Sequence, residues 1–177
     1  TMKKFLLLFL VLWIAGCESK ETAQSTTNAP TIKNVILLIG DGMGLSQVSS
    51  AYYYKGETPN FSRFKNIGLS ITSSAKQKIT DSAAGATAIS AGVKSYNGAI
   101  GVDADTLSVP LINEMLYEQG WKTGIIATSS ITHATPASFY AHVERRSMQD
   151  EIAAQLVSSN IHFAAGGGQE FFTGNIN

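Results

Sequence analysis

Apolar and polar residues follow one another along this chain in blocks that favour an α/β fold. Three apolar runs are typical of strands buried in a parallel sheet, and they cover residues 34–40, 121–129 and 161–167. Amphipathic or small-residue segments predict helices at residues 45–56, 83–91, 109–120 and 147–159. Because strands and helices alternate, we expect an α/β domain with helices on both faces of the sheet.

The beginning of the chain has the pattern of an export signal. Lys3 and Lys4 precede an apolar run at residues 5–15, which is too short to span a bilayer and has the length of a signal-peptide core. The run ends in IAGC, which resembles the bacterial lipobox, where cleavage precedes a cysteine that then receives lipid. We expect residues 1–17 to be a lipoprotein signal peptide with lipidation at Cys17. A buried helix with an incidental thiol is the alternative.

A polar segment separates this signal from the rest of the chain. Residues 18–33 are rich in Ser and Thr, contain Pro30 and have no hydrophobic period, so we expect a tether. A lipid at Cys17 would then hold the domain at residues 34–177 on a bacterial membrane, on the periplasmic side or at the cell surface.

Composition limits the partners that this domain can have. The 177 residues are 44% hydrophobic, which suffices for one core. The 13 basic and 13 acidic side chains give a net charge of zero, so no basic field favours nucleic acid as a partner. Cys17 is the single cysteine, so we expect no disulfide within the domain.

The loop after the first predicted strand carries a carboxylate. In α/β sheets ligands gather at the carboxyl ends of the strands. The sequence GDGMG at residues 40–44 places Asp41 among three glycines, which allow a tight turn and close backbone approach. An exposed carboxylate there suits a metal cation. The alternative is that Asp41 caps the helix that begins at Leu45.

A serine begins the small-residue helix. In TDSAAGATAISAG, residues 80–92, Thr80 or Asp81 would cap the helix and place Ser82 in its first turn. The helix terminus favours an anion there. A serine is a weak nucleophile at neutral pH, and no histidine neighbours it in sequence, so catalysis needs an activator such as a divalent metal. Without a metal, a simple capped helix is the better interpretation.

A third loop carries hydroxyl, imidazole and guanidinium groups in THATPASFYAHVERR, residues 132–146. Pro136 biases Thr135 toward an extended conformation, which would place its hydroxyl beside His133. Arg145 and Arg146 come about three helical turns later and could bind phosphate oxygens in a forked geometry. Taken alone, His133 is more readily a structural histidine. The same interpretation holds more strongly for two others within apolar patterns, His142 and His162.

Together these segments resemble the amino-terminal motifs of the alkaline phosphatases. The motifs NVILLIGDGMG, TDSAAGATAISAGVKSYNGAIGVD and THATPASFYAHVERR occur in the family's order, and the resemblance runs from about residue 34 to the end of the chain. It implies a large central sheet, two zinc ions and one magnesium ion, and hydrolysis of small phosphate monoesters through a phosphoserine intermediate.

The resemblance also assigns roles in phosphate chemistry. Ser82 corresponds to the nucleophile, which zinc would activate in place of a general base. Arg146 corresponds to the arginine that clamps the phosphate, with Arg145 as its nearest competitor. Asp81 would orient that arginine.

The metal ligands follow in the same way. Asp41 would bridge a zinc ion and the magnesium ion, and Ser82 would be a zinc ligand. Thr135 corresponds to the magnesium-site hydroxyl. Family members carry either aspartate or histidine where His133 stands, so we expect His133 to act on magnesium through water.

The family takes its remaining zinc ligands from a carboxyl-terminal half that lies beyond Asn177. We therefore expect this chain to correspond to an amino-terminal fragment that is inactive and unstable alone, with a homodimer possible at full length. One alternative is a related metal-dependent phosphodiesterase or sulfatase, which the DSAAG sequence at residues 81–85 disfavours. Another is a truncated protein that binds phosphate or metal without catalysis.

Overall fold

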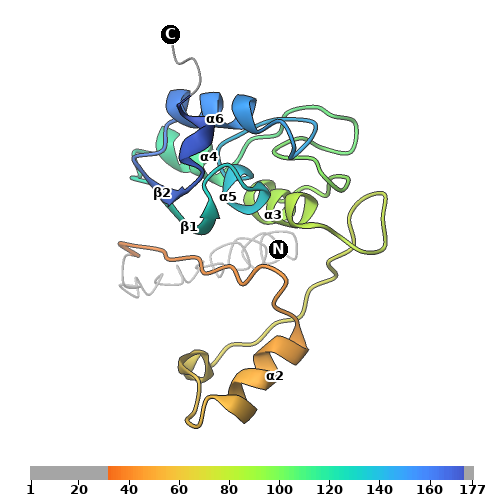
Figure 1. Cartoon of the computed structure of the whole chain (residues 1–177), viewed down its shortest axis with the longest axis vertical. Helices are drawn as coiled ribbons and strands as arrows, with labels where there is room; N and C mark the ends of the chain where they lie inside the picture. Colours follow the sequence, from red (N-terminus) through yellow and green to blue (C-terminus); the bar gives the residue numbers. More distant parts are fainter. Residues whose placement is uncertain (1–31, 174–177) are drawn as a thin grey trace, which may run out of the picture. The chain divides into compact units, whose positions relative to one another are not determined.

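The computed structural model describes residues 32–173. The predicted signal peptide, Cys17 and all but the end of the predicted tether lie outside the described residues. In chain order the elements are α2 (Leu45–Tyr54), the 3₁₀ helix η1 (Asn60–Arg63), α3 (Ser82–Ala91), α4 (Ile112–Glu118), β1 (Gly124–Ser130), α5 (Ala134–Ala137), α6 (Gln149–Ser158), β2 (Phe163–Gly167) and the 3₁₀ helix η2 (Gln169–Phe171) (Figure 1). Each of the four predicted helices is present. The helix α3 begins one residue before its predicted range, and the other three lie within theirs. Among the described residues, no helix combines the length and the apolarity needed to cross a membrane.

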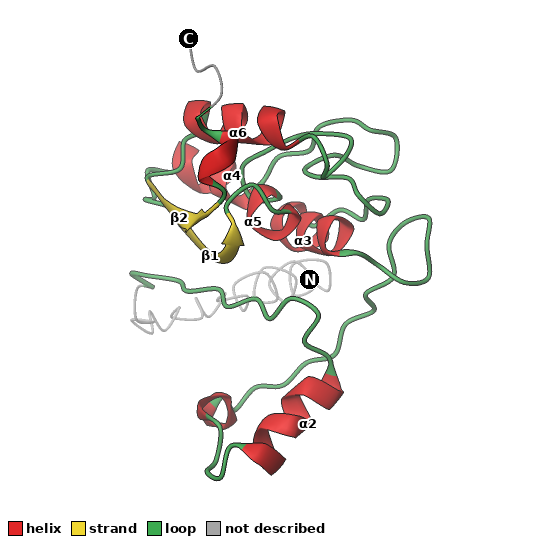
Figure 2. Ribbon diagram, viewed as in Figure 1, coloured by secondary structure: helices red, strands yellow, loops and turns green. Residues whose placement is uncertain are grey.

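The two later strands form the expected parallel pair (Figure 2). Gly124 of β1 lies opposite Phe163 of β2, and Ile126 lies opposite Ala165. The connection between the strands carries α5 and α6, which is the strand–helix–strand arrangement that a parallel pair requires. Both strands lie within the ranges predicted from sequence, apart from the added Ser130 at the end of β1.

The strand predicted at residues 34–40 is not formed. Its apolar side chains are exposed, with Val35 at 76% and Leu38 at 77% of their full accessibility. A strand exists only through hydrogen bonds to a neighbour, and within residues 32–173 the strands that pair are β1 and β2. The described sheet is therefore smaller than the large central sheet that the family resemblance implies. The apolar composition of this run predicts a segment suited to a sheet, but composition alone does not predict which strand it would pair with.

Local signals explain why α3 begins and ends where it does. Asp81 is the N-cap, and its Oδ1 accepts a hydrogen bond of 3.0 Å from the Ala84 N–H. Gly92 ends the helix in the left-handed region, with φ of 70°, which glycine adopts without steric cost. Ser82 is thereby fixed as the first residue of the helix.

Small side chains bring α3 and α5 into contact. Ala83 of α3 and Ala137 of α5 are completely buried in the same core, which also includes Ala134, at 1% exposure, and Ile152 from α6. Half-buried Ile125 of β1 packs against this cluster. Because alanine side chains allow close backbone approach, the two helices lie side by side (Figure 1). Their starts carry Ser82 and Thr135 respectively.

The backbone at Thr135 differs from the prediction. Thr135 is helical rather than extended, because it is the second residue of α5, with His133 as the N-cap. Pro136 occupies the third position, where an N–H would lack a helical partner in any case, so the helix loses no hydrogen bond. The usual restriction on a residue before proline is therefore outweighed in this short, buried helix.

Candidate active site

The carboxylate of Asp41 joins two segments that are distant in sequence. Its Oδ1 accepts a hydrogen bond of 3.0 Å from the Ser82 hydroxyl, and its Oδ2 accepts one of 2.8 Å from the Thr135 hydroxyl. The N-cap of α2 is Gly44, so the alternative in which Asp41 caps this helix is wrong. The loop after residue 40 therefore presents its carboxylate to the starts of α3 and α5.

These contacts favour the ionised form of Asp41. The hydrogen bond from Thr135 is the largest effect and lowers the pKa of this carboxyl, while partial burial opposes it. The hydrogen bond from the Ser82 hydroxyl and the nearby positive charge of Arg146 lower the pKa further. Asp41 is consequently a carboxylate at neutral pH, which is the form that binds cations.

Ser82 is half-buried at the amino end of α3. The positive end of the helix dipole lies at this terminus and favours negative charge beside the hydroxyl. Because the Ser82 hydroxyl donates to Asp41, its lone pairs stay available to another group.

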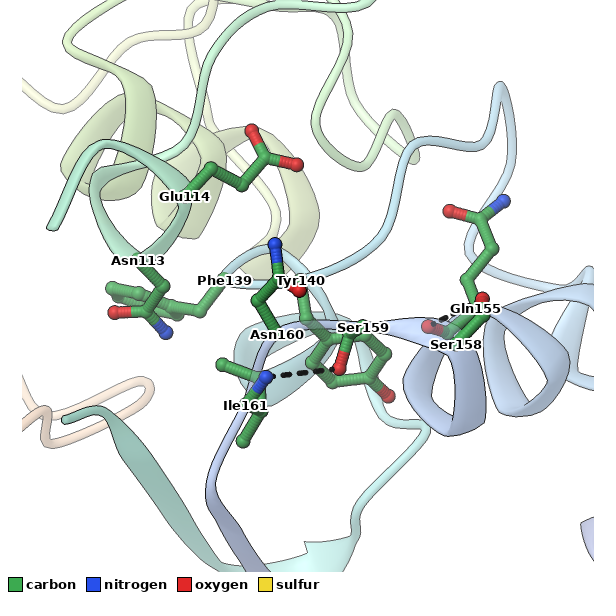
Figure 3. A pocket seen from close by; sticks show the side chains of 9 residues that line it. All are labelled: Asn113, Glu114, Phe139, Tyr140, Gln155, Ser158, Ser159, Asn160 and Ile161. Atoms are coloured by element: carbon green, nitrogen blue, oxygen red, sulfur yellow. Dashed lines mark hydrogen bonds between the residues drawn. The ribbon is translucent and has the colours of Figure 1, made fainter. Parts of the chain in front are cut away.

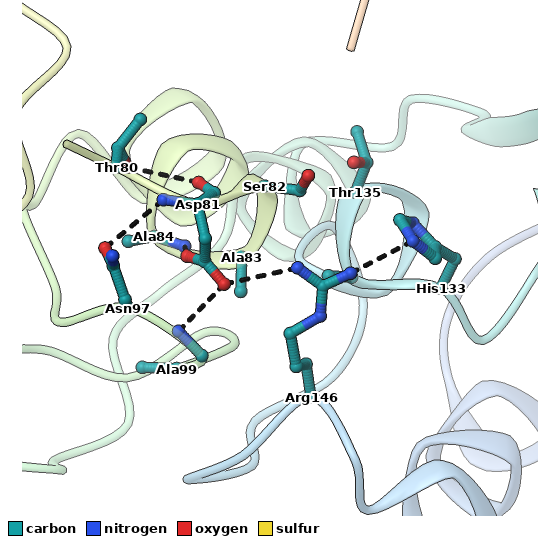
Figure 4. Close-up of polar contacts among 12 residues, drawn as sticks. Thr80, Asp81, Ser82, Ala83, Ala84, Asn97, Ala99, His133, Thr135 and Arg146 are labelled. Atoms are coloured by element: carbon teal, nitrogen blue, oxygen red, sulfur yellow. Dashed lines mark hydrogen bonds and ion pairs between the residues drawn. The ribbon is translucent and has the colours of Figure 1, made fainter. Parts of the chain in front are cut away.

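A second set of contacts holds one arginine beside this serine (Figure 4). Asp81 Oδ2 accepts hydrogen bonds from Arg146 Nη1 at 3.2 Å and from the Gly98 N–H at 3.0 Å. On the other side of the guanidinium, Arg146 Nη2 lies 3.0 Å from His133 Nε2. Since a guanidinium only donates, His133 Nε2 must accept, and a neutral ring then carries its proton on Nδ1. Arg146 is thus held from two sides.

The structure distinguishes the two candidate arginines. Arg145 is exposed, whereas Arg146 is half-buried and contacts Asp81. The sequence spacing had suggested that Arg146 lies on a helix, but it does not. Its backbone N–H donates to Gly98 at 2.7 Å, shortly after an antiparallel bridge between Ile100 and Val143. This pairing, which has no helical period, determines which arginine faces Asp81.

Sequence reasoning missed Asn97 and Gly98. Asn97 Oδ1 accepts a hydrogen bond from the Asp81 N–H at 3.2 Å, and Gly98 bonds to the Asp81 side chain. An Asn-Gly pair indicates a turn, which is the one signal that the sequence offered, but it does not indicate what the turn contacts.

The remaining histidines have structural contacts, in line with their interpretation from sequence. His142 Nδ1 lies 2.7 Å from the Gly101 carbonyl oxygen, and its Nε2 lies 2.9 Å from Glu114 Oε1. His162 Nε2 lies 3.0 Å from Lys122 Nζ. Neither histidine takes part in the contacts of Asp41, Ser82 or Arg146 described above.

A separate pocket of about 220 Å³ lies between α4 and α6 (Figure 3). Its polar lining is largely engaged already. Glu114 bonds to the Leu111 N–H and to His142, and Gln155 bonds to the backbone of His142. The pocket shares no residue with the Asp41 and Arg146 contacts.

The donor atoms present fit part of a metal centre. Asp41 and Thr135 supply the oxygen atoms that Mg²⁺ prefers, and Asp41 and Ser82 supply oxygen atoms that zinc accepts. Zinc is usually four-coordinate with nitrogen, sulfur or carboxylate ligands. Within residues 32–173 no group of three or more His, Cys, Asp or Glu side chains is arranged to hold a metal ion.

Comparison with known proteins gives a consistent picture. The family model of alkaline phosphatase matches residues 32–175. Alkaline phosphatase 4 of Bacillus subtilis (strain 168) is 37% identical over 176 residues, which cover 89% of this chain and 38% of the relative. Alkaline phosphatase 3 of the same organism is 41% identical over 170 residues, with 88% and 37% covered.

The solved structures that this chain resembles are also alkaline phosphatases. Alkaline phosphatase from the Antarctic bacterium TAB5 is 56% identical with a TM-score of 0.78, over 81% of this chain and 42% of that one. A histidine-to-aspartate variant of that enzyme, with magnesium bound in its M3 site, is 55% identical with a TM-score of 0.79, over 81% and 41%. The chain spans less than half the length of the relatives and structures it matches. By the extent of the family match, the chain belongs to the alkaline phosphatase family.

Proposed function

We propose that the full-length gene product hydrolyses small phosphate monoesters through a phosphoserine at Ser82. The observation that supports this is the position of the Ser82 hydroxyl. It lies at the amino end of α3 and is bonded to Asp41 at 3.0 Å, while the neighbouring Asp81 holds the guanidinium of Arg146. The nucleophile at the anion-favouring helix terminus is thus adjacent in sequence to the carboxylate that holds the phosphate-binding guanidinium.

The chemistry proceeds in two displacements at phosphorus. In the first, Ser82 Oγ forms a bond to phosphorus as the bond to the ester oxygen breaks and the alcohol leaves with a proton. In the second, water attacks the phosphoserine, inorganic phosphate leaves, and the Ser82 hydroxyl is restored. Arg146 can donate two N–H groups to phosphate oxygens, and the amino end of α3 favours the same negative charge.

We propose two zinc ions and one magnesium ion as cofactors. Asp41 and Ser82 would contribute to a zinc site, and Asp41 and Thr135 to the magnesium site. When bound, the ions supply positive charge that activates a hydroxyl or a water and stabilises the leaving oxygen.

We keep His133 as an indirect, water-mediated contributor to the magnesium site. Its contact with Arg146 leaves the other ring nitrogen, Nδ1, as a donor to water. The measurement is magnesium affinity by titration. If His133→Ala left this affinity unchanged while Thr135→Ala abolished it, the role assigned to His133 would be wrong.

The experiment that tests the proposed function uses the full-length gene product with Zn²⁺ and Mg²⁺. Hydrolysis of p-nitrophenyl phosphate is measured, and acid-quenched samples are analysed by mass spectrometry for phosphate on the peptide at residues 80–92. We expect Ser82→Ala to abolish both signals. Ser50→Ala is the control, because Ser50 is exposed on α2. Hydrolysis that persists in Ser82→Ala, or a preference for bis-p-nitrophenyl phosphate, would contradict the proposal.

We further propose that the 177-residue chain alone does not turn over phosphate. The support is the partial set of metal ligands among the described residues. The chain is purified, supplied with Zn²⁺ and Mg²⁺, and assayed with the same substrate. Zinc-dependent hydrolysis by this chain would overturn the proposal.

We propose membrane attachment through a lipid at Cys17, with residues 18–33 as the tether. Fatty-acid labelling and membrane fractionation of the full-length gene product test this. Cys17→Ser should prevent labelling and release the protein from the membrane fraction, and a labelled Cys17→Ser variant would refute it. Formation of a homodimer at full length is a separate prediction, measured by analytical ultracentrifugation.

A further inference from the structure

The side chain of Asn97 makes two hydrogen bonds to the backbone that leads into α3, and Figure 4 shows the one to Asp81. Its Oδ1 accepts the Asp81 N–H at 3.2 Å, and its Nδ2 donates to the Ile79 carbonyl oxygen at 2.9 Å. The two backbone groups flank Thr80, which lies directly before the N-cap. A single carboxamide thus satisfies a donor and an acceptor on the same side of this segment.

This arrangement is the one that a neighbouring parallel strand would provide. In a parallel ladder, the C=O of one residue accepts from a residue of the neighbouring strand, and the N–H of that same residue donates to the residue two positions earlier on the neighbouring strand. Because the two partners are an N–H and a carbonyl, the orientation of the Asn97 carboxamide is fixed by its contacts. Aspartate lacks the donor and alanine lacks both groups, so neither can replace asparagine here.

The turn that carries Asn97 also contacts both Asp81 and Arg146. The Gly98 N–H donates to Asp81 Oδ2 at 3.0 Å, and the Gly98 carbonyl oxygen accepts from the Arg146 backbone N–H at 2.7 Å. Gly98 has φ of 92°, which suits glycine. The turn itself is held by the Asn97 N–H, which donates to Gln77 Oε1 at 3.2 Å. One turn therefore makes hydrogen bonds to both Asp81 and Arg146.

We propose that Asn97 is a positioning residue for the phosphate site. It fixes the backbone of Asp81, so that the Asp81 carboxylate can hold Arg146 and so that Ser82 begins α3 at its observed place. Asn97 acts through these residues and does not itself contact phosphate. The inference rests on the proposed phosphotransfer at Ser82.

The first test is kinetic and uses the metal-loaded full-length gene product. Loss of two hydrogen bonds in Asn97→Ala should lower kcat/KM for p-nitrophenyl phosphate by about 10- to 100-fold. Asn97→Asp keeps the size but loses the donor, so it should fall in the same range. Asn113→Ala is the matched control, because Asn113 is also half-buried but lies on α4. Wild-type activity in Asn97→Ala would overturn the proposal.

A double-mutant cycle separates positioning from general loss of folded protein. If Asn97 acts through Arg146, the effect of Asn97→Ala on kcat/KM should shrink to less than about threefold in an Arg146→Ala background. A general loss of folded enzyme would lower activity by the same factor in both backgrounds. Full additivity would therefore overturn the proposal.

A second readout does not depend on activity. Amide hydrogen exchange at Asp81 should become about 10- to 100-fold faster in Asn97→Ala than in Asn113→Ala. If wild-type protein forms no phosphoserine, the proposed function fails. Faster exchange at Asp81 in Asn97→Ala would still support the role of Asn97 in fixing the Asp81 backbone. Unchanged exchange at Asp81 would overturn the positioning role, whatever the activity.

Discussion

Replacing Thr87 by valine tests how the structure joins the serine-bearing helix to the rest of the site. Thr87 lies on α3 and is completely buried. Its Oγ1 accepts a hydrogen bond of 3.1 Å from the Gly101 N–H. The same oxygen lies 3.3 Å from the Ala99 carbonyl oxygen and 3.4 Å from Ser138 Oγ of the segment that follows α5. Valine has the same shape without the hydroxyl.

The magnitude follows from which group loses its partner. In Thr87→Val the buried Gly101 N–H has no acceptor, and a buried unsatisfied donor costs about 1–3 kcal/mol. Ser138 keeps its hydrogen bond of 2.8 Å to the Ala134 carbonyl oxygen, so it adds little. The free energy of unfolding should therefore fall by about 1–3 kcal/mol.

The assay is urea unfolding of the full-length gene product, followed by circular dichroism, together with amide exchange at Gly101. Ser138→Ala is the control. In Ser138→Ala the Ala134 carbonyl oxygen loses the hydroxyl donor but still accepts from the backbone N–H of residue 138 at 3.0 Å. The free energy of unfolding should therefore fall by less than about 1 kcal/mol. If Thr87→Val cost no more than Ser138→Ala and left exchange at Gly101 unchanged, the assignment of Thr87 as the acceptor would be refuted.

Four further predictions concern backbone strain and pH. Gly101→Ala should lower the free energy of unfolding by about 3 kcal/mol or more, because a Cβ there would overlap a backbone carbonyl oxygen at φ of 62°. Gly92→Ala, with φ of 70° and open space, should cost only about 1–2 kcal/mol in the same urea titration. Burial raises the pKa of Tyr140. The neutral Tyr140 side chain therefore contributes stability below about pH 10, and this contribution is lost at higher pH. In urea titrations at several pH values, Tyr140→Phe should reduce this alkaline loss of stability. The hydrogen bond from Thr135 lowers the pKa of Asp41. The ionised Asp41 carboxylate therefore contributes stability above about pH 4, and this contribution is lost as the pH falls through the lowered pKa. Thr135→Val should weaken this acid dependence of stability, and an unchanged dependence would contradict the hydrogen bond as its cause.

The helices were predictable because their signals are local. The N-cap at Asp81 and the left-handed glycine at Gly92 lie at the ends of α3, where the sequence pattern predicts the helix to begin and end. Gly120, with φ of 80°, similarly follows the end of α4, as the sequence predicts. Each signal involves residues within one or two turns of one another, so no distant part of the chain can alter it.

Two predictions failed where distant groups compete with local preference. The run at residues 34–40 has strand composition but no strand partner among residues 32–173. Thr135 precedes proline but is helical, because burial of Ala134 and Ala137 in the core favours the short helix α5. In both cases the sequence gives a preference, and packing or pairing decides the outcome.

By itself, the sequence determined the helices, the parallel strand pair, the family and the residue types of the site. The tertiary structure alone decided that Asp41 bonds to both Ser82 and Thr135, across 41 and 94 positions of sequence. The structure also shows the contact between Asp81 and Arg146, which the family resemblance had favoured over Arg145, and it revealed Asn97. The physical reason is that caps and turns depend on neighbours along the chain. Contacts between loops instead depend on how closely the alanines of α3 and α5 pack, which no local pattern specifies.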